Sequence, residues 1–161
     1  MSRYITAVIA ALLVIMMCVG CSNKTAKTSS ECDKQEGEHK AAHGGSLNAI
    51  VTCENGHAEV KLDGNKMQMW FVGGGPNTDK SIRVPDKSIS LQIDAKGSKK
   101  TLILTPKPLE LAGEKVGDCS YFEGNAPWLN GTKEFNASGQ ITFKGKNMPL
   151  KIEYPKGYDP D

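Results

Sequence analysis

From His43 onward the chain alternates short apolar runs with breaks rich in Gly, Pro, Asn and Asp. Within these runs apolar and polar positions alternate with period two, and no helical period lasts longer than a turn or two. We therefore expect a single all-β domain over residues 43–161, either an antiparallel β-sandwich or a partly open barrel of about eight or nine short strands. One brief helical piece is expected near APWLNGTKEF. The candidate strands are SLNAIVTC, HAEVKL, KMQMWFV, KSIRV, SISLQID, KKTLILT, CSYFEG, GQITFKG and NMPLKIEY.

Two turn signals predict that residues 46–72 form a three-stranded meander. The first is Asn55-Gly56; as a two-residue loop it would place Cys53 opposite Ala58. Because side chains alternate with period two, this register predicts one apolar face. Its members in the first two strands are Leu47, Ala49, Val51, Cys53, Ala58, Val60 and Leu62.

The second turn signal lies at residues 63–65, Asp-Gly-Asn. A Gly64-Asn65 loop pairs Asp63 with Lys66, an arrangement of opposite charges. Met67, Met69 and Phe71 then extend the apolar face, opposite Leu62 and Val60. The other face collects His57, Glu59, Lys61, Lys66, Gln68 and Trp70.

This register separates the candidate metal ligands of the meander. The Met-x-Met pair beside a tryptophan resembles the small periplasmic copper chaperones of efflux systems, in which two methionines, a histidine and a tryptophan enclose Cu(I). The resemblance implies a soft-metal site built from Met67, Met69 and His57, and thioethers do select Cu(I). The register instead predicts that both methionines fill the core, since Met packs well there. His57 and Trp70 would remain on the opposite face as a contact surface for a partner.

The N-terminus has the layout of a secretory signal peptide: one basic residue, Arg3, and then an apolar run from Ile5 to Gly20. That run is shorter than the roughly 20 residues of a membrane-spanning helix. Val19, Gly20 and Cys21 resemble the lipobox of bacterial lipoproteins. The resemblance implies cleavage after residue 20, acylation of Cys21 with palmitate-type chains, and stable attachment to membrane lipid.

Residues 21–42 would form the lipidated cysteine and a flexible tether. The segment from 22 to 42 contains no leucine, isoleucine, valine or aromatic residue and cannot bury enough apolar surface to order itself. His39 and His43 lie four apart, so a helical turn would place both imidazoles on one face, where they could take a divalent metal. A solvated tether is the interpretation that we favour, because nothing else orders the segment.

The mature chain has Cys32, Cys53 and Cys119 besides the lipidated cysteine, an odd number for an oxidising compartment. The pairing we favour is a Cys53–Cys119 disulfide with Cys32 unpaired. Unpaired buried thiols are the alternative.

Charge and motifs exclude some classes of function. Removal of residues 1–20 takes away only Arg3 from 20 basic and 18 acidic side chains, so the mature chain is close to neutral and nucleic acid is not an expected partner. No nucleophile elbow, phosphate loop or pair of carboxylates suited to acid–base catalysis is present. We therefore expect no enzymatic activity and no required cofactor, with Cu or Zn as the candidate metals.

The run from His43 to Tyr154 resembles small secreted or lipid-anchored β proteins of unknown function from planctomycete-type bacteria. The shared outline is a His-Gly-Gly opening, HAEVKLD, KSIRVPDKSISLQI, SYFEG and a closing GQITFKGKNMPLKIEY. The resemblance implies a weak association with metal efflux. It adds no site residues.

Together these features predict a non-enzymatic binding or accessory lipoprotein of the bacterial cell envelope. In the lipoproteins that it resembles, a residue other than Asp after the acylated cysteine directs the protein to the outer membrane, so Ser22 implies an outer-membrane anchor with the domain facing the periplasm. An envelope protein is its expected partner. The alternative is a periplasmic Cu or Zn binding protein of metal efflux or homeostasis, with ligands drawn from His39, His43, His57, Met67 and Met69.

Overall fold

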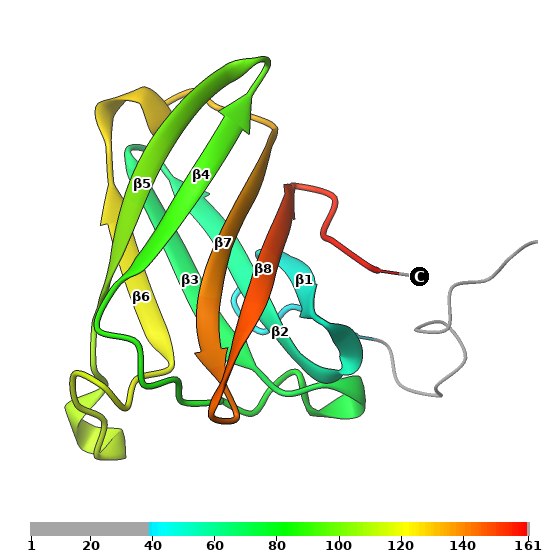
Figure 1. Cartoon of the computed structure of the whole chain (residues 1–161), viewed down its shortest axis with the longest axis vertical. Coiled ribbons are helices and arrows are strands. Elements are labelled where there is room, and N and C mark those ends of the chain that lie inside the picture. The colour runs from blue at the N-terminus through cyan, green and yellow to red at the C-terminus, as the bar shows by residue number, and fades with distance from the viewer. Residues whose placement is uncertain (1–38, 161) are drawn as a thin grey trace, which may run out of the picture.

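The computed structural model describes residues 39–160, which form a barrel of β-strands (Figure 1). Three 3₁₀ turns interrupt its connections: η2 (Gly75–Asn77), η3 (Glu110–Ala112) and η4 (Pro127–Leu129). The strands are β1 (Ser46–Ile50), β2 (Thr52–Asp63), β3 (Lys66–Val72), β4 (Ile89–Ala95), β5 (Ser98–Pro106), β6 (Tyr121–Asn125), β7 (Phe135–Phe143) and β8 (Lys146–Tyr154).

All eight strands belong to one antiparallel sheet in the order β1-β2-β3-β6-β5-β4-β7-β8. The sheet curls until β8 approaches β1, so the barrel is nearly closed (Figure 1). Closure matters because it leaves few unpaired strand edges exposed to other chains. The prediction of an all-β fold with about eight short strands is confirmed.

Inward-facing side chains fill the barrel with a continuous apolar core. In β4, for example, Ile89, Leu91 and Ile93 are buried while Ser90 and Gln92 between them are exposed. Each fully buried side chain of this size stabilises the fold by about 1.5–3 kcal/mol. The largest side chains with no more than a trace of exposure are Phe71, Phe122, Ile50, Met67, Met69, Ile89, Leu91, Ile93, Leu104, Leu129, Ile141 and Leu150.

The second predicted hairpin is confirmed in its register. Asp63 pairs with Lys66 across the Gly64-Asn65 loop, and Met67 and Met69 are fully buried on the inner face. Both methionines are therefore core residues, as the period-two pattern predicted.

The first predicted hairpin is wrong. β2 continues through Asn55-Gly56, and the chain reverses earlier, at Val51, so that Ile50 pairs with Thr52. Val51 has a φ of 69°, which a β-branched residue rarely adopts. Gly56, with a φ of 150°, lets the strand bend without turning back.

This earlier reversal shifts β1 by five residues against β2, so that Asn48 takes the place expected for Cys53, and because five is an odd number the shift exchanges the two faces of β1. Asn48 now lies opposite Ala58 and points into the barrel, where it is fully buried. Leu47 and Ala49, which were expected to face the core, take the opposite side of the strand.

The buried amide of Asn48 bridges the seam between β1 and β8. Its Nδ2 donates to the carbonyls of Ser46 and Ala58 at 3.0 and 3.2 Å. Its Oδ1 accepts from the backbone N–H groups of Glu153 and Tyr158 at 2.9 and 3.0 Å. One side chain thus hydrogen-bonds to backbone groups on both sides of the seam. It takes the place of the ladder of backbone hydrogen bonds that β1 and β8 do not form with each other.

Two further expectations need correction. KSIRV forms no strand; it contributes isolated backbone bridges, Ser81 with Val72 and Val84 with Cys119. The stretch expected to be helical becomes η4 followed by the start of β7. Among residues 39–160, no helix has the length and apolar character needed to cross a membrane.

We predict that Asn48→Ala destabilises the barrel, because it leaves the buried N–H groups of Glu153 and Tyr158 without an acceptor. The expected loss of unfolding free energy is about 2–5 kcal/mol, measured by urea denaturation. Asn147→Ala is the control: this exposed side chain makes a single hydrogen bond, to Gln140, and its loss should change stability by less than about 0.5 kcal/mol. Equal effects of the two substitutions would contradict the role assigned to Asn48.

Candidate metal centre

A short segment, which we call the N-terminal strap (residues 39–45), packs on the outer face of β2 and β3. Thr78 Oγ1 donates to the carbonyl of Lys40 at 2.9 Å, and the backbone N–H of Gly45 donates to Glu59 Oε1 at 2.9 Å. The flexible tether was expected to extend to residue 42, but these contacts place residues 39–42 in the folded domain. The remainder of the expected tether and the signal peptide lie outside the described residues.

Glu59 is the residue that fixes the strap. Its carboxylate is fully buried, accepts the backbone N–H groups of His43 and Gly45, and contacts His43 Nδ1 at 2.8 Å. A buried carboxylate needs several such donors to offset the loss of hydration. Three donors from one short segment therefore attach the strap firmly.

His43 belongs to an aromatic stack and not to a metal cluster. Its ring lies parallel to the indole of Trp70, with centroids 4.2 Å apart, and Trp70 stacks in turn on Tyr121 at 4.9 Å. One ring nitrogen of His43 is held by Glu59, whereas His39 lies against His57. The helical turn that would pair His39 with His43 does not form, because residues 42–45 form a turn and a bend whose N–H groups bond to Glu59.

His57 and Trp70 do share the outer face of the meander, but they do not form the exposed contact surface that was expected. His57 is only 3% exposed, and both faces of the Trp70 ring are covered by His43 and Tyr121. The strap supplies His43, and β6 supplies Tyr121.

His57 is held in one orientation and one tautomer. Its Nδ1 lies 3.2 Å from the carbonyl of Gly73, which can only accept, so Nδ1 carries the proton and Nε2 keeps its lone pair. Burial lowers the pKa of His57 below its ordinary value of 6.5; the Gly73 hydrogen bond opposes this shift and the nearby His39 adds to it. The ring is thus neutral at physiological pH, the form that binds metals.

The position of Gly73 depends on a close approach between its loop and β2. A Cβ added to the next residue, Gly74, would lie 2.1 Å from the carbonyl oxygen of Glu54. Only glycine permits this contact, which sets the Gly73 carbonyl against His57. The sequence VGGGPN is therefore a structural part of the site.

His39 completes a pair of imidazoles. Its ring lies edge-on to that of His57, with centroids 5.2 Å apart and planes at 81°. The Nε2 atom of His39 is buried without a hydrogen-bond partner among the described residues. A buried polar atom left in this way costs free energy unless something binds it.

Cys53 joins the two histidines. One ring nitrogen of His39, one of His57 and Cys53 Sγ all lie within 4.8 Å of one another. A metal ion with ligand distances of about 2.0–2.3 Å can bridge atoms at such separations. Because β2 is continuous from Thr52, the side chains of Cys53 and His57, four residues apart, point to the same side of the strand. The predicted Asn55-Gly56 turn would have placed them on opposite sides.

The predicted Cys53–Cys119 disulfide is wrong. Cys53 is disulfide-bonded, but Cys119 is a buried free thiol two residues before β6, and its Sγ donates to the carbonyl of Tyr121. Burial raises the pKa of the Cys119 thiol and makes it a poor nucleophile. Cys53 instead faces the C-terminal segment, with Sγ 3.6 Å from Asp159 Oδ1.

Met67 and Met69 take no part in this cluster. Both lie inside the barrel on the face of β3 opposite to His57, so the ligand set implied by the copper-chaperone resemblance is not assembled. The sequence identified His39 and His57 as separate candidate ligands but did not predict that they lie side by side. The spacing Cys53-x-x-x-His57 within one strand was the available signal, since it places both side chains on one face.

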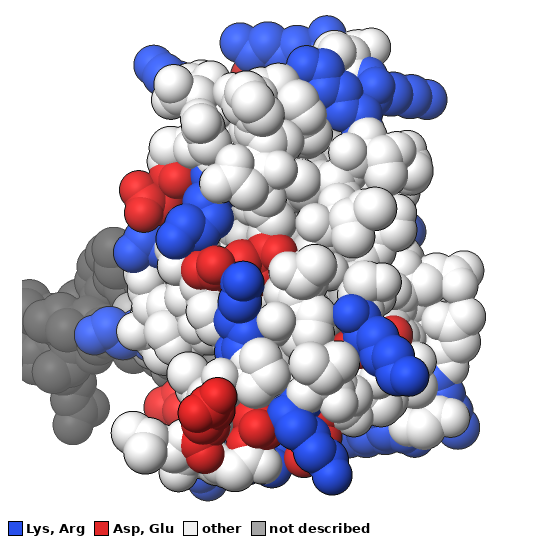
Figure 2. Space-filling view, turned by 90° about the vertical axis from the view of Figure 1, so that its left-hand side faces the viewer, with Lys and Arg blue, Asp and Glu red and all other residues white. Residues whose placement is uncertain are grey.

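Basic side chains gather at the end of the barrel that carries the β4–β5 hairpin, whereas both signs of charge mix elsewhere on the face in Figure 2. Two of these lysines already have partners: Lys96 lies 3.7 Å from Glu134, and Lys100 sits over the Trp128 ring. This cluster lies on elements that contribute nothing to the His39–Cys53–His57 group.

Comparison with known proteins supplies no relative: no protein-family model, curated protein or solved structure matches this chain.

We predict that the barrel loses stability as the pH falls from about 7.5 to about 5.5. In this window the unfolded chain protonates His57 near its ordinary pKa while the folded chain resists, so the unfolded state binds more protons and is favoured. Urea denaturation at several pH values measures the slope. His57→Asn, whose amide can still donate to Gly73, should flatten it; an unchanged slope in this variant would exclude His57 as the cause.

Proposed function

We propose that this protein is a lipid-anchored, non-enzymatic binding module of the bacterial cell envelope, and that its ligand is a transition-metal ion held by His39 and His57. The observation that carries the proposal is the buried Nε2 of His39, which has no hydrogen-bond partner within residues 39–160 and lies beside His57 and Cys53. A bound cation would satisfy that nitrogen.

The geometry of His57 supports the same proposal. Metal-binding histidines usually donate their second ring N–H to a carbonyl or carboxylate, which fixes the tautomer and directs the other nitrogen at the metal. The Gly73 carbonyl performs this role for His57. The low pKa of His57 means that little free energy is lost in displacing a proton when the metal binds.

The donor types favour zinc or copper. Imidazole nitrogens suit Zn, Cu, Fe and Ni, whereas Mg and Ca prefer oxygen ligands. With the Cys53 disulfide intact, the protein offers two nitrogens. After reduction the Cys53 thiol can lose its proton and add a thiolate, giving a His₂Cys set that suits Zn(II).

The location of the cluster suggests what metal binding does. His39 is the first described residue, at the point where the chain enters the barrel, while His57 belongs to the barrel wall. A shared ion would therefore pin the membrane-proximal end of the domain to β2. In the proposed arrangement, Cys21 anchors the chain in the outer membrane and the domain faces an envelope partner in the periplasm.

A binding role fits the interior of the barrel better than catalysis does. Apolar side chains fill the interior, so no substrate enters it. The proposed module acts through its surface and through the metal cluster, in line with the implied association with metal efflux.

We predict saturable binding of Zn(II) to the purified chain by isothermal titration calorimetry at micromolar metal. His39→Ala and His57→Asn should each weaken binding by about tenfold or more, since each removes one of few ligands. Reduction of the protein should tighten binding by adding the Cys53 thiolate, and Cys53→Ser should abolish this increment.

The matched control is His43→Gln, which removes the third histidine of the chain and retains a donor for Glu59. It should bind zinc as the wild type does. Absence of saturable heat, or equal affinity in the wild type and in a His39→Ala, His57→Asn double variant, would refute the metal site.

A separate prediction concerns the anchor. Cells given radiolabelled palmitate should incorporate label into the wild-type protein and not into Cys21→Ser, because the resemblance to a lipobox assigns acylation to that residue alone. Label in both proteins, or in neither, would refute the lipid anchor and leave the metal site standing.

A further inference from the structure

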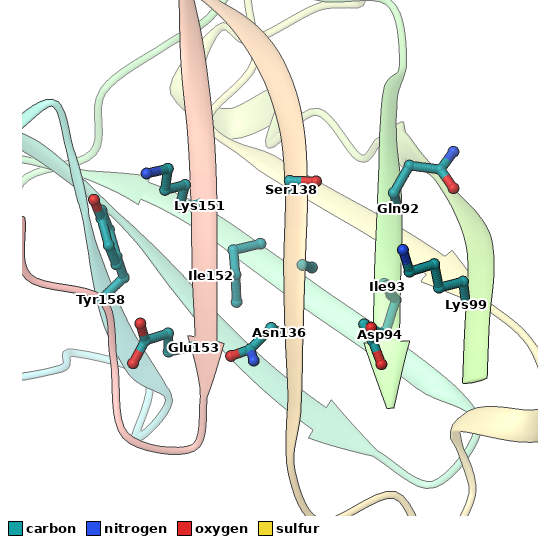
Figure 3. Close-up of a pocket in the computed structure, with 11 residues that line it drawn as sticks. Gln92, Ile93, Asp94, Lys99, Asn136, Ser138, Lys151, Ile152, Glu153 and Tyr158 are labelled. Atoms are coloured by element: carbon teal, nitrogen blue, oxygen red, sulfur yellow. The ribbon is translucent and has the colours of Figure 1, made fainter. Parts of the chain in front are cut away.

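A trough crosses the outer face of the barrel where β4, β7 and β8 lie side by side (Figure 3). It has a volume of about 560 Å³. Its lining shares no residue with the His39–Cys53–His57 cluster. The side chains that shape it are Gln92, Asn136, Ser138, Lys151, Glu153 and Tyr158.

The trough exists because β7 carries short side chains between longer ones. Asn136 and Ser138 form the floor, while Lys99 and Gln92 rise from β5 and β4 on one side and Tyr158 stands on the other (Figure 3). Ser138 rather than a bulky residue at the centre of β7 keeps the trough open.

The Tyr158 wall is fixed in place by backbone contacts. Its N–H donates to Asn48 Oδ1 at 3.0 Å and its carbonyl accepts from Ala49 N–H at 2.8 Å. Gly157, with a φ of 89°, approaches β1 so closely that a Cβ there would lie 2.4 Å from the carbonyl oxygen of Leu47. A rigid aromatic wall loses little conformational entropy when a ligand packs against it.

Two further depressions extend the trough along β7. One, of about 450 Å³, shares Asp94, Asn136 and Glu153 with it and reaches Glu134. The other, of about 430 Å³, shares Gln92 and Ser138 and reaches Gln140. From residue 134 to residue 140 a strand covers about 20 Å, so the surface suits an elongated ligand.

The charged side chains of the lining are balanced in sign. Lys99 and Lys151 face Asp94 and Glu153, so no single sign of charge dominates. Ile93 and Ile152 also line the trough, and apolar atoms make up most of its exposed surface. The balance of charge disfavours a polyanion or a polycation.

Hydrogen-bonding capacity remains available on the floor. Among residues 39–160, the side chains of Asn136, Ser138 and Lys99 make no hydrogen bond or ion pair with another protein group. Amide, hydroxyl and ammonium groups can donate to and accept from ligand hydroxyls in many orientations. The Lys151 Nζ atom lies over the Tyr158 ring, 5.4 Å from its centroid, so a sugar ring can pack its C–H groups on this apolar face once the flexible lysine side chain moves aside.

A peptide added as an extra strand does not fit here. β7 is paired with β4 on one side and β8 on the other, so its backbone groups are already used. The ligand must therefore be recognised by side chains alone.

We propose that this trough binds a linear, uncharged oligosaccharide along β7. The hydroxyl groups of consecutive sugars are held by Asn136, Ser138 and Gln92, and one ring packs against Tyr158. The proposal does not depend on the metal site, and each can fail while the other stands.

The test is calorimetric titration of the purified full chain with linear hexasaccharides of β-1,4-linked glucose, xylose and N-acetylglucosamine. We expect at least one of them to bind with saturable heat. Ser138→Tyr, which fills the trough at an exposed position and leaves the core unchanged, should weaken that binding by about tenfold or more.

Ser88→Tyr is the matched control, because Ser88 is exposed and does not line the trough. It should bind the oligosaccharide as the wild type does, and equal unfolding free energies of the two variants show that both are folded. The proposal is overturned if no neutral hexasaccharide binds, if Ser138→Tyr binds as tightly as Ser88→Tyr, or if only an acidic hexagalacturonide binds.

Discussion

The buried amide of Asn48 is the interaction on which the rest of the barrel depends. A sheet of eight strands that curls without closing leaves backbone donors and acceptors at its two edges, and burying them unpaired is costly. The Asn48 side chain reduces this cost, because it accepts hydrogen bonds from the backbone N–H groups of Glu153 and Tyr158 and donates one to the carbonyl of Ala58. The polar group inside an otherwise apolar core is therefore what joins the first strand to the last.

Closure of the seam also places the C-terminal segment. Since Asn48 and Ala49 hold both backbone groups of Tyr158, the residues on either side of it are carried to defined positions. Tyr158 becomes the wall of the outer trough, and Asp159 reaches the neighbourhood of Cys53. A segment with no regular secondary structure thus contributes to two separate surfaces, because a core residue fixes its course.

The period-two pattern predicted the all-β class and the second hairpin, because burial on one face of a strand determines the parity of every residue in it. It failed at the first hairpin, since Asn55-Gly56 is a strong turn signal locally but the chain reverses at Val51, in a conformation that valine seldom adopts. That single displacement hid the inward position of Asn48 and the shared parity of Cys53 and His57. The disulfide prediction failed because strand context does not determine which cysteines meet: Cys119 comes just before β6, and β3 separates β6 from the β2 strand that carries Cys53.

The strap shows why composition alone misjudged residues 39–42. They carry no large apolar side chain, yet they are ordered because the buried carboxylate of Glu59 holds the adjoining His43 and Gly45, and Thr78 holds Lys40. Once the strap is fixed, His39 is held beside His57, and no group in the described part of the chain hydrogen-bonds to its Nε2. Any ligand that binds this folded arrangement and not the unfolded chain must stabilise it, by a free energy that grows with the logarithm of the ratio of ligand concentration to dissociation constant. The hydrogen bonds to the Glu59 carboxylate therefore fix the position of the strap. The fixed strap in turn brings His39 beside His57 and so creates the two-histidine site at the start of the domain.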